Sequence, residues 1–253
     1  MAGTRRSPSQ YNFRNLKFDE MLLPTSGNLR RSSPRSGKIK HVTIHHMTVK
    51  DSNNGEANRK CVEIWRSRQA SAHYGVDRNH VAQFVYDKRM AWGNGNGTAN
   101  QEGLVVEHAN STIGDKNGWQ IAEATLKTSA KLVAALHLRH KLGRPTTVGF
   151  GEGGTVRTHR SWKATACPGP YFQKVWDRYM DMVQAEYDAL TKKPAKKPPF
   201  KRPEYHTVVY GHRLSSIAKK YKRHRWQLIR WNKLKFPYRI KAGQRIYLNP
   251  PKK

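Results

Sequence analysis

Two residues with metal-binding side chains, His159 and Cys167, stand eight positions apart and directly before a Pro-Gly pair. Far upstream, the β-branched run H-V-T-I-H-H-M at 41–47 ends in two histidines, so a third ligand can come from an early strand. Zinc that is held by three protein ligands keeps a fourth position open, which is typical of catalytic rather than structural sites. The pattern therefore favours a catalytic zinc centre.

The pair His45 and His46 leaves two candidates for the third ligand. Residues 40–46 combine β-branched residues with alternating polarity, which predicts a buried strand. Neighbouring strand residues point to opposite faces, so only one of the two histidines can reach the metal.

Three further motifs connect these residues to a known family. They are S-A-H-Y-G-V-D at 71–77, E-G-L-V-V-E-H at 102–108 and H-R-S-W-K-A-T-A-C-P-G at 159–169. In order and interval they resemble the type-2 N-acetylmuramoyl-L-alanine amidases, which share their fold with peptidoglycan-recognition proteins and amidase-type phage lysozymes. This resemblance covers about residues 38–188, and a second one, to the LysM cell-wall-binding module, covers most of 205–249.

The amidase resemblance implies a zinc cofactor and a set of site residues. The ligands would be His45, His159 and Cys167, with His45 chosen because the family motif uses the first histidine of the pair. Glu107 would relay a proton to the leaving amine, since it ends an apolar strand as in many phage and bacterial members. Thr165 would either hydrogen-bond the oxyanion or only order its loop.

Other positions near the motifs carry weaker implications. Another branch of the family uses a tyrosine at the position where this sequence has Ala72. We do not assign the role of that tyrosine to Tyr74, two residues further on. Lys163 is a minor candidate to assist catalysis. His73 and Trp92 are candidates to line the substrate groove, although either could lie in the core or at the rim. Three asparagines near the glycine loop are candidates for hydrogen bonds to glycan: Asn94, Asn96 and Asn100.

Net charge is +31, and it is unevenly distributed along the 253 residues. Residues 191–253 contain 20 Lys or Arg against one acid, Glu204, which leaves a net +12 for the rest of the chain. Nucleic acid is a common partner of such basic chains, but anionic wall polymers such as teichoic acid use the same attraction. The zinc motif favours the wall, and part of the charge can also be a solvated, solubilising surface.

The chain has two cysteines, and because Cys167 is wanted as a ligand, no disulfide framework is implied. Cys61 is expected to be a small buried residue. The first residues lack the apolar segment of a signal peptide, and no stretch approaches the length of a membrane span. These features predict synthesis in the host cytoplasm and release as a phage endolysin through holin lesions, or less readily an autolysin exported by an unusual route.

Patterning along the chain predicts an α/β fold with a mixed sheet flanked by helices, plus a small βααβ module. The predicted domains are a basic irregular arm (1–37), a zinc amidase domain (38–190), a Lys/Pro-rich linker (191–204) and the LysM-like module (205–249). Within the amidase domain we expect strands at 40–46, 72–77, 81–86 and 104–108, a loop at 93–98, and helices at 61–70, 119–142 and 170–190.

The resulting function is hydrolysis of the amide between N-acetylmuramic acid and L-alanine in peptidoglycan. A non-catalytic peptidoglycan-binding protein of the same fold is the first alternative. A nucleic-acid-binding protein is a weaker one, suggested by the mixture of arginine and tryptophan at 225–231.

Overall fold

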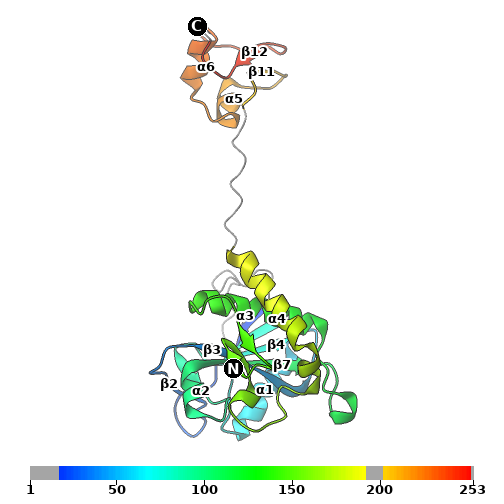
Figure 1. Ribbon diagram of the computed structural model, residues 1–253. Helices are drawn as coiled ribbons and strands as arrows, with labels where there is room; N and C mark the ends of the chain where they lie inside the picture. The colour runs from blue at the N-terminus through cyan, green and yellow to red at the C-terminus, as the bar shows by residue number, and fades with distance from the viewer. Residues whose placement is uncertain (1–16, 192–201, 252–253) are drawn as a thin grey trace. The chain divides into compact units, whose positions relative to one another are not determined.

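The computed structural model describes residues 17–191 and 202–251, and the chain divides into two compact units between residues 192 and 193 (Figure 1). The first part of the predicted arm, residues 1–16, and most of the predicted linker lie outside the described residues.

The first unit is built on one six-stranded sheet in the order β1-β5-β4-β7-β3-β10. Only the β4–β5 pair is antiparallel, and the other neighbours run parallel, so the prediction of a mixed sheet is confirmed. In that order the strands are Lys17–Glu20, His80–Gln83, Tyr74–Asp77, Gly103–Asn110, His41–Lys50 and Val156–Thr158.

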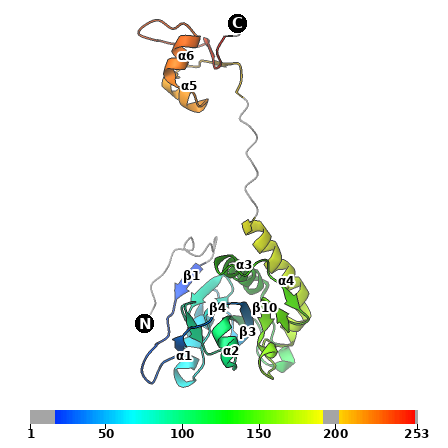
Figure 2. The same ribbon diagram turned by 60° about the vertical axis from the view of Figure 1, so that its left-hand side comes forward.

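Helices cover both faces of this sheet (Figure 2). Helices α3 (Glu123–Arg139) and α4 (Pro170–Thr191) pack on one face, and α1 (Glu56–Ser67) packs on the other. The three predicted long helices are therefore present, with ends that differ from the predicted ones by up to five residues.

The pleat of β3 divides its side chains between these two faces. Val42 and Ile44 belong to the core beneath α3 and α4, whereas Met47 and Val49 belong to the core beneath α1. Since side chains alternate along a strand, the odd-numbered residues of β3 face α1 and the even-numbered ones face α3 and α4. His45 and His46 consequently lie on opposite faces of the sheet.

Several short elements escape the sequence prediction. The loop predicted at 93–98 ends in a helix, α2 (Gly97–Glu102), whose first turn is capped by the Asn96 side chain accepting from the Ala99 backbone N–H. Two small two-stranded sheets and two 3-10 turns complete the unit. They are β2 (Ser32–Pro34) with β6 (Arg89–Ala91), β8 (Thr147–Val148) with β9 (Gly153–Gly154), η2 (Asp115–Asn117) and η3 (His159–Ser161).

The prediction of an irregular arm is wrong for residues 17–37, because β1 joins the main sheet and β2 pairs with β6. Two arginines also anchor this segment. Arg31 is a buried residue, 4% exposed, and its guanidinium donates to the carbonyls of Trp65 and Arg66 at the end of α1. Arg35 donates to the carbonyl of Gly103 at 2.9 Å and to the carbonyls of Asp87, Arg89 and Gln101. These two charges satisfy buried main-chain acceptors, which would be costly to leave unpaired.

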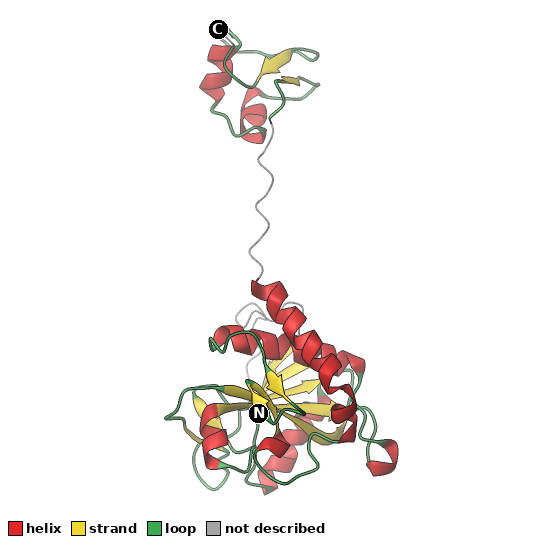
Figure 3. Cartoon of the chain, in the orientation of Figure 1, coloured by secondary structure: helices red, strands yellow, loops and turns green. Residues whose placement is uncertain are grey.

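The second unit has the predicted βααβ order (Figure 3). Strand β11 (Tyr205–Thr207) pairs antiparallel with β12 (Arg245–Tyr247), and α5 (Leu214–Lys220) and α6 (Arg225–Trp231) lie between them in the chain. The β-branched V-V-Y run at 208–210 follows the first strand: Val208 is buried in the small core, but Tyr210 is 98% exposed. In both described units, no helix combines the length and apolarity needed to cross a bilayer.

Candidate metal centre and cleft

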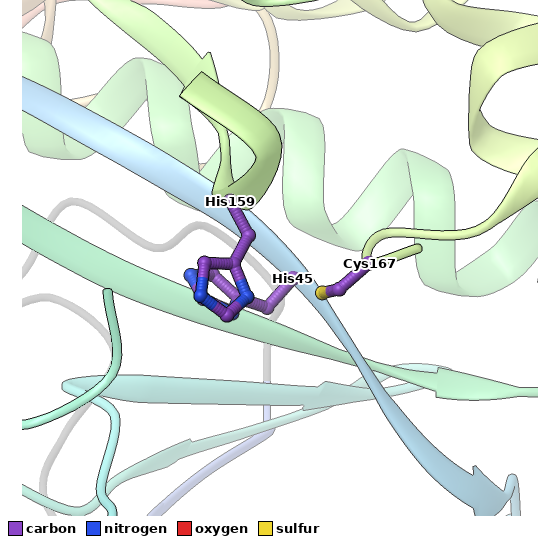
Figure 4. A group of neighbouring side chains, drawn as sticks. All are labelled: His45, His159 and Cys167. Carbon is purple, nitrogen blue, oxygen red and sulfur yellow. The ribbon is translucent and has the colours of Figure 1, made fainter. Parts of the chain in front are cut away.

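Three side chains from distant parts of the chain meet at one point (Figure 4). His45 comes from β3, His159 from η3 directly after β10, and Cys167 from the loop before α4. One potential ligand atom from each lies within 4.8 Å of the others. The two imidazole rings are 4.2 Å apart between centroids, and the Cys167 sulfur is turned toward them. The structure thus brings together the three residues predicted as ligands.

The protonation of the histidines suits metal binding. Burial lowers the pKa of His45 well below its usual range, with the neighbouring His159 acting in the same direction. Burial also lowers the pKa of His159, and the nearby Lys163 acts in the same direction. Both rings are therefore neutral near pH 7, which is the form that ligates metals. Within the described residues, neither ring nitrogen of His159 has a hydrogen-bond partner, although both are buried.

Cys167 is held as a thiol rather than a thiolate in the absence of a cation. Burial raises its pKa well above the usual range, and the carboxyl of Glu107 raises it further. A positive ion placed among the three groups would reverse this preference, because a coordinating thiol is deprotonated.

His46, the rival of His45, is not in this group. Its Nδ1 lies 3.3 Å from the side-chain nitrogen of Asn110, and its ring packs edge-on against Trp119 at 5.4 Å between centroids. The pleat of β3 explains the difference, because it directs the two histidines to opposite faces.

Glu107 lies beside His45 because the parallel β3–β7 register pairs these two residues directly. Its Oε1 is 3.9 Å from His45 Nδ1, and its Oε2 has no hydrogen-bond partner among the described residues. The side chain is 14% exposed, and burial raises the pKa of the carboxyl to about 8. A carboxyl with such a pKa can accept and return a proton near neutral pH.

A cleft of about 480 Å³ opens over these groups. Thr165 lines it, and its hydroxyl oxygen accepts a hydrogen bond from the Cys167 backbone N–H at 3.2 Å, so it orders the loop that carries the thiol. Lys163 is not among the lining residues. The walls include residues of α1, of the loop before α4, and of the η2 region, such as Cys61, Trp65, Arg68, Asp115, Trp119 and Gly169.

A buried hydrogen-bonded chain supports the His45 backbone from the other face of the sheet. His108 Nδ1 lies 2.7 Å from the His45 carbonyl oxygen and therefore donates to it, which makes Nε2 an acceptor for the Ser129 hydroxyl at 2.6 Å. The Ser129 oxygen in turn lies 2.7 Å from the Tyr179 hydroxyl. The sequence analysis did not identify this support, because its members come from three separate elements.

Two predicted groove candidates serve other purposes. His73 is fully buried and lies outside the cleft lining: its Nδ1 accepts from the Val105 backbone N–H, and its Nε2 is 3.0 Å from the Arg89 carbonyl. Trp92 donates its indole N–H to the Ser33 hydroxyl at 3.0 Å and is also absent from the lining. Cys61 is buried as expected, yet it lies in the cleft wall near Glu107.

The predicted glycan-binding role is wrong for Asn94 and Asn100, because both side chains are buried, and it stays a prediction for the exposed Asn96. Asn94 is fully buried with its side chain against His45, Asn96 caps α2, and the Asn100 side chain accepts from the Asn94 backbone N–H. The side chains of Asn94 and Asn100 are used within the protein. An asparagine directly before Gly-Thr-Ala is a capping signal that indicates the start of α2.

Comparison with known proteins agrees with this geometry. Residues 35–170 match the family model described as N-acetylmuramoyl-L-alanine amidase, and residues 206–249 match the LysM domain. The amidase XlyB of Bacillus subtilis is 28% identical over 90% of this chain and 70% of its own length. The amidase CwlA of the same organism is 30% identical over 62% of this chain, which spans about half, 53%, of CwlA.

Solved structures share the fold at low identity. PlyL aligns with a TM-score of 0.50 and 24% identity over 65% of this chain and 95% of its own. The Staphylococcus aureus hydrolase AmiA, solved with its ligand, aligns with a TM-score of 0.54 and 17% identity over 75% and 94%.

The chain belongs to the N-acetylmuramoyl-L-alanine amidase family, because the family model covers more than half of it. It is a peptidoglycan amidase with a C-terminal LysM domain, as the two resemblances in the sequence predict.

The placement of the two histidines predicts different metal binding in their variants. His45→Ala should abolish stoichiometric Co²⁺ binding, whereas His46→Ala should retain it, because only His45 faces the other two groups. Co²⁺ titration followed by the thiolate charge-transfer band measures both. Circular dichroism checks that both variants are folded. If both then lose the charge-transfer band equally, the assignment of His45 and His46 to opposite faces is contradicted.

Proposed function

We propose that this chain is a zinc-dependent enzyme that hydrolyses the amide between the lactyl group of N-acetylmuramic acid and L-alanine of the stem peptide. The observation that carries the proposal is the convergence of His45, His159 and Cys167 at the floor of an open cleft. Residues 38–190 would form the catalytic domain, and 205–249 the wall-binding domain.

The donor set fits zinc better than the other common ions. Two imidazole nitrogens and one thiolate are soft or intermediate ligands that suit zinc, whereas magnesium and calcium prefer oxygen. The two unpaired, buried nitrogens of His159 also favour a bound cation, because unpaired polar groups are costly inside a protein. Three protein ligands leave one position of a tetrahedral site for water or substrate.

When bound, zinc would polarise the scissile carbonyl and lower the pKa of its water ligand. Glu107 would take the proton from the attacking water and deliver it to the leaving nitrogen of L-alanine, a role supported by its raised pKa and its position next to His45. The Thr165 hydroxyl would donate its hydrogen to the developing oxyanion while its oxygen continues to accept from the Cys167 N–H.

The function is tested by the products of digested peptidoglycan. We expect new free L-alanine amino termini, detected by mass spectrometry, and no new reducing sugar ends. New reducing ends without amino termini would indicate a glycosidase and refute the assignment.

The proposed proton relay separates Glu107 from the metal ligands. Glu107→Gln keeps the shape of the side chain but cannot carry the proton, so the cleavage rate should fall by ~10²–10⁴-fold, with bound zinc unchanged. Cys167→Ser and His159→Ala should lose both the bound zinc and the cleavage activity. Glu56→Gln, an exposed acid on α1, is the matched control and should keep full activity. A fully active Glu107→Gln enzyme would move the relay to another residue.

The raised pKa of Cys167 predicts that zinc binding releases protons. The thiol must ionise to bind, while the two histidines are already neutral, so zinc affinity should fall in acid. Near pH 7 it should rise about tenfold per pH unit for one released proton, and more steeply if Glu107 also ionises. Calorimetry in buffers of different ionisation enthalpy counts the protons released. We expect one to two per zinc for the wild-type protein, the second coming from Glu107, and one per zinc for Glu107→Gln. Proton-free zinc binding by this variant would exclude the thiolate ligand.

The C-terminal unit supplies two distinct attractions to the wall. Its described part, residues 202–251, contains 13 Lys or Arg and one acid, and it exposes the aromatic side chains of Tyr210, Trp226 and Phe236. We propose that the LysM domain binds peptidoglycan and that the basic charge adds a screened attraction to anionic wall polymers such as teichoic acid.

Deleting residues 191–253 separates these contributions from catalysis. The truncated enzyme should cleave a soluble muropeptide at a similar rate but bind whole walls poorly, because every proposed ligand precedes residue 168. Binding of the full chain should weaken with salt if charge dominates, since the Debye length is about 8 Å at physiological ionic strength. Duplex DNA as a competitor tests the nucleic-acid alternative. Unchanged wall binding by the truncated enzyme would contradict an anchoring role.

We also propose that the enzyme acts as a phage endolysin. A structure described as a mutant endolysin from Bacillus subtilis shares the fold, with a TM-score of 0.50 at 17% identity. Cells that produce the protein should stay intact until the membrane is permeabilised and should then lyse, as judged by turbidity. Lysis without permeabilisation would argue for a different route to the wall.

A further inference from the structure

One buried amide, that of Asn94, contacts the proposed metal centre without being a potential ligand. Asn94 lies between β6 and α2 and is fully buried. Its Oδ1 is 3.2 Å from His45 Nε2. A buried amide is expensive unless its donors and acceptors are satisfied, so its contacts define its orientation.

The surroundings fix which end of the amide faces His45. Asn94 Nδ2 donates to the Ala99 carbonyl at 2.9 Å, and this acceptor requires the nitrogen at that end. A flipped amide would place its oxygen against the Ala99 oxygen. The Asn94 backbone N–H is held as well, because it donates to the Asn100 side-chain oxygen at 2.8 Å. The oxygen therefore faces the imidazole.

Two neighbouring glycines make this tight placement possible. A Cβ on Gly93 would approach the Ser71 carbonyl oxygen to 2.9 Å, and a Cβ on Gly95 would approach the Lys163 side chain to 2.8 Å. Gly95 also has a φ of +63°, which L side chains rarely adopt. The G-N-G sequence thus allows the loop to pass close to the site with the Asn94 side chain directed inward.

The orientation of the amide determines the tautomer of His45. An amide oxygen can only accept, so His45 Nε2 must carry the hydrogen and donate it. The unprotonated nitrogen is then Nδ1, which lies 3.9 Å from Glu107 Oε1 on the neighbouring strand. Metal-bound histidines in general have their tautomer and ring orientation set by the partner of the other nitrogen.

We propose that Asn94 is a positioning residue that holds His45 as the Nε2–H tautomer, so that Nδ1 is the atom presented to the metal. The proposal deepens the proposed function, because it assumes that His45 is a ligand. It assigns a role to the glycine loop that is independent of substrate binding.

The tautomer can be measured without any metal. In the metal-free protein labelled with ¹⁵N-histidine, the His45 Nε2 resonance should have the shift of a protonated nitrogen, and Nδ1 that of an unprotonated one. Asn94→Asp retains an oxygen acceptor and should retain this tautomer. Asn94→Ala removes the acceptor and should give a mixture or the Nδ1–H form.

Zinc affinity supplies a second readout. Competition with a chelator should show a ~10–100-fold loss for Asn94→Ala, the size typical for removing such a partner, and a smaller loss for Asn94→Asp. Asn96→Ala is the matched control in the same loop, because it removes the cap of α2 but does not touch His45. It should leave both the tautomer and the zinc affinity unchanged.

Several results would overturn the proposal. They are an Nδ1–H tautomer in the wild-type protein, an unchanged tautomer in Asn94→Ala, or equal loss of zinc affinity in Asn94→Ala and Asn96→Ala. If Asn94→Ala fails to fold, the wild-type and Asn94→Asp spectra decide. Failure of the wild-type protein to bind zinc would refute the proposed function, whereas the metal-free tautomer would still test the hydrogen bond.

Discussion

The parallel pairing of β3 with β7 is the constraint on which the site depends. Its register sets His45 directly beside Glu107, and the pleat turns both side chains toward the α1 face, where the cleft lies. If β3 slipped by one residue, His46 would take the place of His45 beside Glu107. The His45 side chain would then point to the opposite face of the sheet. The apolar residues that alternate along both strands resist such a slip, because it would exchange their buried environments.

The remaining parts of the site hold this arrangement from several directions. His108, linked to Ser129, fixes the backbone of His45 from the α3 face, while the buried Asn94 contacts its ring. The arm contributes through Arg31, which satisfies the carbonyls at the end of α1, the helix that forms one wall of the cleft. Burial keeps the His45 ring neutral and raises the pKa of the Glu107 carboxyl. The packing that forms the fold therefore also sets the protonation of the site.

Local periodicity predicted the fold class and the main helices, and the resemblance to the amidase family implied the convergence of His45, His159 and Cys167. The sequence did not predict β1, β2 or the roles of Arg31 and Asn94. Those features depend on contacts between segments 30 or more residues apart, as in the bond from Arg31 to the Trp65 carbonyl. The roles predicted for Asn94 and Asn100 are wrong for a related reason: an Asn-Gly-rich loop resembles an exposed polar surface unless the burial of these two residues is known.

The central claim is that a zinc ion is bound by two histidines and one cysteine. X-ray absorption at the zinc edge of the full-length protein measures this directly. We expect one sulfur at about 2.3 Å and nitrogen or oxygen neighbours at about 2.0–2.1 Å, with the sulfur shell lost in Cys167→Ser. A zinc shell without sulfur in the wild-type protein, or one unchanged in that variant, would contradict the account.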